Sequence, residues 1–335
     1  MRTQDNTRNP EVLLHPVRIG NVEIPGNLFL APVAGFSDSP FRSICIENGA
    51  DLVFTEMVSC EGLSRDSQKT INLTHKQKNQ QLLAVQVFAP DPVTAVRGVK
   101  QLSSQKPDLI DLNCGCPVPK IIRTGCGSAL MKTPEMIGKI VHAIKQETDA
   151  PVTVKIRSGW DASSITYLQA AKSAEEAGAA MVSIHARTRA QGYSGKADHE
   201  HTRILKSRLS IPVTASGDLF SPEDAERIFK QTGCDAVMFA RGAVGNPFIF
   251  RKTKEYLETG TYTNESHEAK LRTALRQLEM MAEITSELRA CKEMRKHMCA
   301  YTKGLQGGAA LRQKVVHAET IQEYNALITD FLNSL

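Results

Sequence analysis

Eight short apolar runs, each followed by a longer amphipathic stretch, constrain the fold of this chain more than any other feature. Strands separated by helices pair in parallel, because only antiparallel neighbours can be joined by a tight turn. Eight strand and helix units are the number that closes a (β/α)8 barrel. We therefore predict an α/β fold with a TIM barrel. The runs are Leu28–Ala31, Leu52–Thr55, Ala84–Phe88, Leu109–Leu112, Val152–Ile156, Met181–His185, Val213–Ala215 and Ala236–Ala240.

The helical stretches between these runs have recognisable starts. Asp91, Thr133 and Ser221 each precede a proline, which places a capping side chain before a proline in the first turn. The fourth predicted helix, Ser163–Ala177, lacks such a start and is inferred from its place between two predicted strands. The predicted helices are Pro92–Leu102, Pro134–Glu147, Ser163–Ala177 and Pro222–Lys230.

The strand and helix alternation stops after Pro247. A barrel takes about 250 residues, so a large part of the 335-residue chain lies outside it. Residues 265–335 have apolar side chains at three- and four-residue spacing and no strand-like run. We predict a small all-helical domain at the C-terminus. The expected division is a catalytic barrel over residues 1–250 and a helical domain over residues 251–335.

Composition limits the class of protein. The polar opening and the lack of an apolar run of about 18 residues favour a cytoplasmic protein that does not cross a membrane. Eight cysteines are scattered without paired C-x-x-C spacing, so most are expected to be buried as small apolar residues. His199 and His201 lack partners at ligand spacing, so we expect no metal and place both at the surface or beside the substrate.

The stretch over residues 107–131, PDLIDLNCGCPVPKIIRTGCGSALM, combines a short buried strand with a loop rich in glycine and proline. Cys116 lies in this loop, just past the strand end, where parallel barrels carry their chemistry. A thiol with a near-normal pKa can donate a proton. The alternative is a buried structural thiol, which fits most of the eight cysteines; the position after the strand and the N-x-G-C-P context favour the proton donor for Cys116. We predict that Cys116 is catalytic.

This stretch resembles the signature loop of the tRNA-dihydrouridine synthase family, N-x-G-C-P followed by K-x-x-x-x-x-x-G-x-x-L, and Cys116 stands at the position of that family's proton donor. Cys114 departs from the pattern, because the family usually has a methionine-like residue there, and we treat it as a spectator. The resemblance covers roughly residues 15–305. The other motifs are LAPVAGFSDSPFR, TEMVS, VQVFAPDP, VTVKIRSGW, SIHARTRAQGYSGKADH, VTASGDLFSPEDA, VMFARGAVGNPFIF and ACKEMRKHMCAYTKG.

The resemblance implies a site for flavin mononucleotide (FMN) at the strand ends. The ammonium of Lys155 can stabilise negative charge on a reduced ring, and Gln86 can pair with a flavin amide in both directions. The loops after the last two strands can bind the phosphate, although ordinary barrel turns are an alternative for them. The FMN contacts that the resemblance implies are Ala31, Pro32, Val33, Gln86, Lys155, Ser216, Gly217, Asp218, Ala240 and Arg241, with Asn113 and Arg157 facing the uracil. His185 and Arg187 follow a predicted strand, and the neighbouring arginines argue against a core histidine. We predict a neutral His185 imidazole that faces the flavin or an RNA phosphate and count it as an eleventh FMN contact, with Arg187 toward the substrate.

The function that the resemblance implies is reduction of D-loop uridines in tRNA to 5,6-dihydrouridine. NADPH, or NADH, would reduce bound FMN, and Cys116 would protonate the uracil ring of an extruded base. We expect a monomer. One alternative is a small-molecule flavin oxidoreductase resembling dihydroorotate dehydrogenase, which has no use for a basic helical appendage. The other is a non-catalytic RNA-binding module, which would not need Lys155, Gln86 and a phosphate-binding mouth together.

The helical region is strongly basic. Residues 289–314 contain seven Lys or Arg against the single acid Glu293, which gives a net charge of +6. The bland interpretation is a solvated helix face. We predict instead that Arg295 and Lys296 belong to a tRNA-binding face, with Tyr301 as a ring able to stack on a base.

Overall fold

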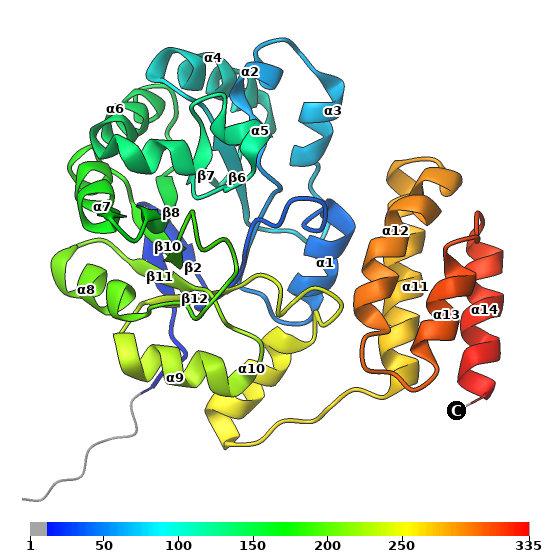
Figure 1. Ribbon diagram of the computed structural model, residues 1–335. Coiled ribbons are helices and arrows are strands. Elements are labelled where there is room, and N and C mark those ends of the chain that lie inside the picture. The colour runs from blue at the N-terminus through cyan, green and yellow to red at the C-terminus, as the bar shows by residue number, and fades with distance from the viewer. Residues whose placement is uncertain (1–11, 335) are drawn as a thin grey trace, which may run out of the picture.

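The computed structural model describes residues 12–334, and eight parallel strands form a closed barrel at its centre (Figure 1). The strands follow one another in chain order around the barrel, and the circle closes because β10 pairs with β8 as well as with β11. The predicted TIM barrel is confirmed. Its strands are β3 (Leu28–Leu30), β4 (Leu52–Phe54), β6 (Leu83–Phe88), β7 (Leu109–Cys114), β8 (Val152–Asp161), β10 (Met181–Thr188), β11 (Val213–Ser216) and β12 (Ala236–Phe239).

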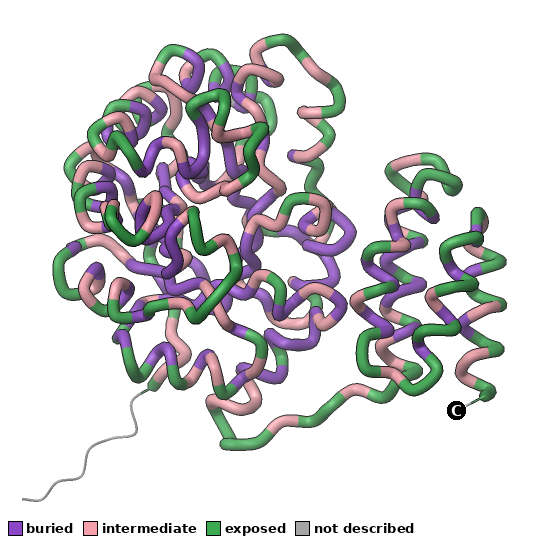
Figure 2. Tube along the Cα trace, in the orientation of Figure 1, coloured by how far each residue is buried: buried purple, intermediate pink, exposed green. Residues whose placement is uncertain are grey.

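Helices cover the outside of the barrel, and Figure 2 shows the buried residues gathered on the strands and on the inner faces of these helices. Two of the predicted caps are present, since Asp91 accepts from the Thr94 amide and Ser221 forms a capping box with Asp224. Thr133 was wrongly predicted as a cap, because its side chain makes no capping bond. The helices are α1 (Ser39–Glu47), α2 (Cys60–Leu63), α3 (Gln68–Ile71), α4 (Pro92–Leu102), α5 (Pro119–Ile122), α6 (Pro134–Lys145), α7 (Tyr167–Glu176), α8 (Glu200–Arg208), α9 (Pro222–Thr232) and α10 (Ile249–Thr259).

The strands β8 and β10 extend beyond the barrel at its carboxyl-terminal end. The outer part of β8 pairs antiparallel with the short strand β9 (Ser164–Ile165), so the first residues of the predicted helix over Ser163–Ala177 are extended instead. The remaining short strand, β5 (Val58–Ser59), pairs with β6. Short 3-10 turns occur at η1 (Asn72–Thr74), η2 (Ser103–Gln105) and η3 (Gly127–Lys132).

A hairpin of β1 (Val17–Ile19) and β2 (Val22–Ile24) closes the N-terminal end of the barrel. Its apolar side chains are buried in one cluster with residues that fill the barrel interior, among them Phe29, Phe54 and Met181. The same cluster continues upward to Ala31 and Met238, near the opposite end. The interior is therefore packed from the hairpin to the level of the strand ends.

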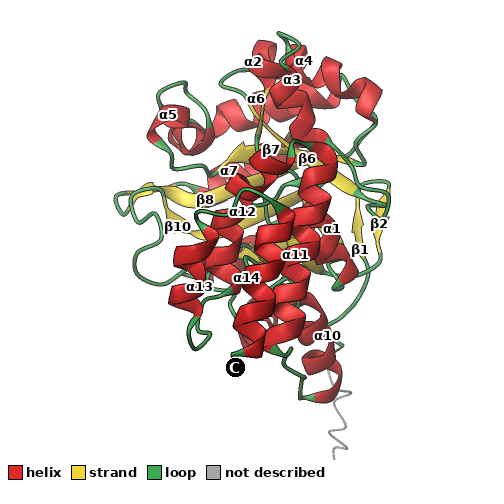
Figure 3. Ribbon diagram, turned by 90° about the vertical axis from the view of Figure 1, so that its right-hand side faces the viewer, coloured by secondary structure: helices red, strands yellow, loops and turns green. Residues whose placement is uncertain are grey.

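The C-terminal region is all-helical, as predicted, and lies beside α1 in Figures 1 and 3. Its own apolar core is separate from the core between barrel and helices. The core includes Tyr301, which is 1% exposed and donates to Gln277 at 3.0 Å, so the prediction of a stacking ring was wrong. The helices are α11 (His267–Ile284), α12 (Glu287–Tyr301), α13 (Gly308–Val315) and α14 (Ile321–Asn333).

The expected division at residue 250 falls inside α10. Ile249 and Phe250 of this helix are buried in the core of the barrel, whereas the core of the helical region begins at Leu271. We therefore propose that the two domains divide in the segment 260–266, which connects α10 to α11.

The helical domain packs directly on the barrel. Both terminal nitrogens of Arg276 in α11 contact Glu47 of α1, at 2.5 and 2.6 Å. The buried His297 ring of α12 lies 5.1 Å from the ring of Phe36. A Cβ at Gly245 would lie 2.4 Å from the carbonyl carbon of Ala300, so this loop of the barrel and α12 are in backbone contact. These contacts fix α12 next to the barrel mouth.

Candidate functional site

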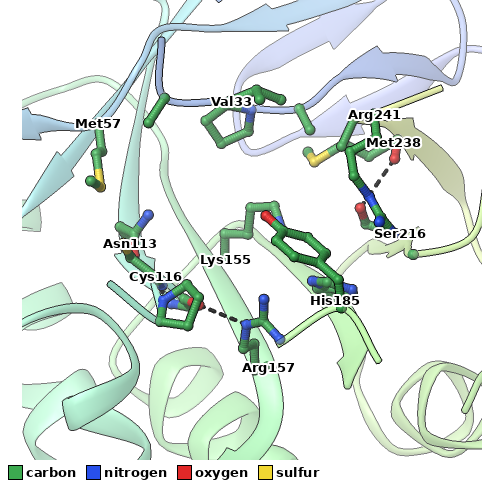
Figure 4. Close-up of a pocket in the computed structure, with 18 of the residues that line it drawn as sticks. Val33, Met57, Asn113, Cys116, Lys155, Arg157, His185, Ser216, Met238 and Arg241 are labelled. Carbon is green, nitrogen blue, oxygen red and sulfur yellow. Dashed lines mark hydrogen bonds between the residues drawn. The ribbon is translucent and has the colours of Figure 1, made fainter. Parts of the chain in front are cut away.

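A cavity of about 340 Å³ opens at the carboxyl ends of the barrel strands, within the size range of ligand sites in proteins. All eleven residues that were predicted to contact FMN line this cavity. Cys116, Asn113 and Arg157 line it as well. Figure 4 shows Asn113 and Cys116 on one side of the cavity, Ser216 and Arg241 on the other, and Lys155 between them. The lining residues that the sequence did not single out include Met57, Tyr193, Phe220 and Met238.

A chain of side-chain hydrogen bonds links the floor of the cavity to the cysteine loop. Asp111 accepts from Gln86 Nε2 at 2.7 Å, and Gln86 Oε1 accepts from Asn113 Nδ2 at 2.8 Å. Asn113 Oδ1 then accepts from the backbone amide of Cys116 at 2.9 Å. Because an ionised carboxylate only accepts hydrogen bonds, Asp111 sets the direction of both amides. Of the two Gln86 N–H groups, one donates to Asp111 and one is left for a ligand. The sequence had suggested an amide with all its groups free for the flavin.

Asp111 is fully buried, and burial raises the pKa of its carboxyl to about 6, although hydrogen bonds from Thr153 and Gln86 and the charge of Lys155 act in the opposite direction. The folded protein therefore binds this proton more tightly than the unfolded chain does. Ionised Asp111 costs stability above pH 6, and the cost disappears as the pH falls toward 4. A buried carboxyl with a strongly shifted pKa directly below the cavity is typical of a functional position.

Asp111→Asn is expected to stabilise the flavin-free protein at pH 7.5 by roughly 2 kcal/mol, because it removes a buried charge and the new amide can still bond to Thr153. Urea unfolding at pH 7.5 and pH 5 measures the effect, and the gain should shrink at pH 5. A gain of equal size at both pH values, or a loss of stability at pH 7.5, would contradict the assignment of a raised pKa to Asp111.

Lys155 rises from β8 into the centre of the site. Burial lowers the pKa of its ammonium to about 8, helped by the nearby charge of Arg157 and opposed by Asp111. In the part of the chain that the structure describes, residues 12–334, its side chain forms no ion pair at salt-bridge distance. A desolvated cation of this kind stabilises negative charge on a ligand more strongly than an exposed one.

His185 is held neutral. Burial lowers the pKa of its imidazole far below the usual range, and the charges of Lys155 and three arginines act in the same direction. Its Nε2 lies 3.3 Å from Arg187 Nη1, which can only donate, so the remaining ring proton is on Nδ1. The predicted neutral imidazole at the cavity fits this environment.

Arg187 does not line the cavity, although the sequence placed it toward the substrate. It is 2% exposed and donates to both carboxylate oxygens of Asp218, at 2.8 and 2.7 Å. The strand register shifts between His185 and Thr188, which turns Arg187 into the protein. Arg187 therefore supports the Ser216–Asp218 loop from behind the cavity wall.

His199 supports the same loop, and the expectation that it lies at the surface or beside the substrate was wrong. It is 4% exposed and its Nε2 lies 3.0 Å from the carbonyl of Gly217. Gly217 has φ +112, and a Cβ there would lie 2.9 Å from a ring carbon of His185. Glycine is required here both by its backbone conformation and by this close approach.

The second loop places a cation at the cavity rim. Arg241 lies 4.3 Å over the ring of Tyr193 and 5.2 Å over the ring of Phe220, and its terminal nitrogen is 3.7 Å from Asp218. Its side chain is 41% exposed, so it remains accessible to an anion. Cations next to loop amides after the last two strands form the usual phosphate site of these barrels.

Cys116 is partly exposed at the cavity, whereas Cys114 is fully buried in the core between barrel and helices. Burial raises the pKa of the Cys116 thiol, while a hydrogen bond from the Val118 amide and the charge of Arg157 oppose the shift. The expectation of a near-normal pKa is thus corrected upward. A thiol with a raised pKa keeps its proton at neutral pH, as a proton donor must. Six of the eight cysteines are buried, as predicted.

Comparison with known proteins matches this arrangement of residues. A family model described as dihydrouridine synthase (Dus) covers residues 29–335. The chain belongs to the dihydrouridine synthase family. A "Probable tRNA-dihydrouridine synthase" of Treponema pallidum (strain Nichols) is 44% identical over 95% of this chain and 96% of its own length. The tRNA-dihydrouridine synthase B of Pseudomonas aeruginosa is 36% identical over 88% of this chain and 90% of its own.

Solved structures of other enzymes share the barrel fold of this dihydrouridine synthase. Morphinone reductase superposes with a TM-score of 0.54 at 14% identity, covering 78% of this chain and 92% of its own. A 2-naphthoyl-CoA reductase complex gives a TM-score of 0.59 at 12% identity, covering 73% of this chain and 52% of its own. At such identities the likeness concerns the barrel alone.

The residues present in this dihydrouridine synthase fit a flavin nucleotide. An apolar wall of Ala31, Pro32 and Val33 faces the cavity, and the buried cation of Lys155 lies at its centre. The Ser216–Asp218 loop is held by His199 and Arg187, and Arg241 lies on the same side of the cavity. The Ser216 hydroxyl donates to the Met238 carbonyl at 3.1 Å, so this side chain links the ends of β11 and β12 below the two loops.

No helix in residues 12–334 has the length and apolar character needed to cross a bilayer.

Proposed function

We propose that this protein reduces specific uridines in the D-loop of tRNA to 5,6-dihydrouridine, using FMN that NADPH, or NADH, has reduced. The observation that supports the proposal most is the placement of one protonated thiol, Cys116, in the same cavity as eleven residues suited to FMN. The names of the relatives point to the same reaction. A cytoplasmic monomer remains a prediction.

Each side chain has a definable part in this chemistry. FMN bound in the cavity and reduced by NADPH, or NADH, would supply the hydride that one carbon of the uracil double bond takes up. Cys116 holds the proton that the adjacent carbon takes up, and the Asn113 bond to the Cys116 amide fixes the loop that carries it. Arg157 is held by the carbonyls of Gly115, Thr188 and Gly192, which orient its guanidinium at the substrate side of the cavity.

Two measurements test the proposed function. The purified protein is expected to carry non-covalent FMN, visible in its absorption spectrum and released by denaturation. Mass spectrometry of tRNA from a strain that lacks the gene is expected to show loss of dihydrouridine at defined positions, restored by the wild-type gene. A colourless protein that takes up no added FMN, or a deletion strain with unchanged dihydrouridine, would refute the proposal.

We propose further that α12 contacts tRNA through Lys296, with a smaller part for Arg295. Lys296 is exposed, and its ammonium lies 5.8 Å over the ring of Phe36 at the barrel mouth. Arg295 is half-buried and its Nη2 lies 3.5 Å from the carbonyl of Ala318, so part of its role is within the helical domain.

Replacing Arg295 and Lys296 by Ala is expected to weaken binding of many tRNAs about tenfold and to flatten the salt dependence, because fewer phosphates are neutralised by the protein. Binding isotherms at several salt concentrations measure both effects. FMN content and reduction by NADPH should stay at wild-type values. The single variant Lys296→Ala separates RNA contact from folding, since Arg295→Ala also affects the packing of α12. Unchanged affinity and slope in the double variant would exclude this face.

A further inference from the structure

Trp160, the only tryptophan of the chain, lies at the rim of the barrel mouth. It follows Arg157 by three residues on β8, so it lies roughly 10 Å further out along the strand. Its carbonyl accepts from the amide of Ala190, which ties it to the loop after β10. The indole is half-buried at the edge of the face that carries the cavity.

Two cations from different loops meet at this indole. Lys132 Nζ lies 3.7 Å from the ring centroid, and Arg189 Cζ lies 4.5 Å from it, both within the range of cation–π contacts. Lys132 ends the turn that follows the cysteine loop, and Arg189 directly follows β10. We call Lys132, Trp160 and Arg189 the rim triad.

The rim triad has an unbalanced positive charge. Among the described residues 12–334, neither Lys132 nor Arg189 forms an ion pair at salt-bridge distance, and the neighbouring Asp161 accepts from the amide and hydroxyl of Ser163 instead. Two like charges held at one aromatic ring repel each other, and an anion that approaches both cations relieves the repulsion. The aromatic ring holds both cations in place before such an anion arrives.

The position of the rim triad indicates which kind of anion can bind there. Strand β8 is four strands from β3 in the closed barrel of eight, so the two lie on opposite sides of the mouth. Lys296 of α12 lies by Phe36, just after β3, while the rim triad lies just after β8. A polyanion that touches both cationic points must cross the cavity between them.

We propose that the rim triad is a second docking point for tRNA, which binds backbone phosphates next to the uridine that enters the cavity. This inference rests on the proposed function for the identity of the RNA. The rim triad and Lys296 then hold the strand on both sides of the cavity. Trp160 acts as a positioning residue, because it orients the two cations that contact phosphate.

The single tryptophan gives a direct probe. Titration of the FMN-loaded protein with an unmodified tRNA transcript is expected to change Trp160 fluorescence with the same midpoint as tRNA binding. Lys132→Ala/Arg189→Ala is expected to weaken tRNA binding about tenfold and to lower the salt slope by about two, one for each cation removed from a phosphate. The FMN content reports that each variant is folded. The matched control is Lys139→Ala/Arg208→Ala, with exposed cations on α6 and at the end of α8, and it should bind as wild type does.

The outcomes separate the two levels of the proposal. If wild type binds tRNA but the Lys132/Arg189 variant keeps the same affinity and salt slope, the rim triad is not a docking point, and the proposed function stands. If wild type shows no salt-dependent tRNA binding, the proposed function fails first. Polyglutamate is the competing anion: an equal change of Trp160 fluorescence at equal charge concentration would overturn the assignment to RNA in favour of an acidic protein partner.

Discussion

Cys116→Ala is expected to lower dihydrouridine formation by a factor of about 10² to 10⁴, the usual contribution of a positioned acid. In the proposed reaction the Cys116 thiol is the proton donor, since it lines the cavity and its raised pKa keeps it protonated. Single-turnover assays with pre-reduced protein and a tRNA transcript measure the loss. FMN content and the rate of flavin reduction by NADPH should remain unchanged, because the thiol acts after that step.

The matched control for this prediction is Cys114→Ala. Cys114 lies two residues away, as the last residue of β7, and is fully buried in the core between barrel and helices. Its replacement should reduce stability by leaving a small void in this core, and the turnover of folded protein should stay near wild type. A Cys116 variant that loses flavin reduction as severely as dihydrouridine formation would make Cys116 a structural residue.

Lys155→Met is expected to slow flavin reduction by NADPH about 100-fold, because it removes the buried positive charge from the centre of the cavity and leaves a side chain of similar length. Stopped-flow absorbance of the flavin measures the rate. The pH dependence of the reduction rate is a second test of the role of Lys155. Lys155 is protonated below its pKa of about 8, so the wild-type rate should fall as the pH rises through that value, and the variant should lack this fall.

Lys206→Met is a suitable control, since Lys206 pairs with Asp235 at 2.7 Å and does not line the cavity. Its rate and pH profile should match those of wild type. If Lys155→Met keeps the wild-type rate and the same fall near pH 8, the charge of Lys155 has no part in the reaction.

Most of the barrel could be predicted from sequence because each strand is buried on both faces and therefore forms a continuous apolar run. Each of the eight runs overlaps an observed strand, and their ends place the cavity residues. The outer parts of β8 and β10 were missed. They carry Arg157, Trp160 and Arg187, polar or amphipathic residues that a search for apolar runs passes over.

The misplaced side chains have definite physical causes. Arg187 turns inward at a register shift in β10, and no local sequence signal marks such a bulge. Tyr301 could have been placed correctly, because Met294 and Met298 precede it at seven- and three-residue spacing on the apolar face of α12. The role of Asp111 depends on contacts with Gln86 and Thr153, which are distant in sequence, so it emerges only from the folded chain.

The hairpin at the N-terminal end of the barrel limits how substrates can reach the cavity. Since β1 and β2 seal that end and apolar side chains fill the interior above them, nothing can pass through the barrel from below. In the proposed reaction, the nicotinamide donor and the uridine then share one opening. The two must take turns, and each tRNA has to leave before the next reductant enters. A long residence of the RNA on α12 and the rim would slow the recharging of the flavin.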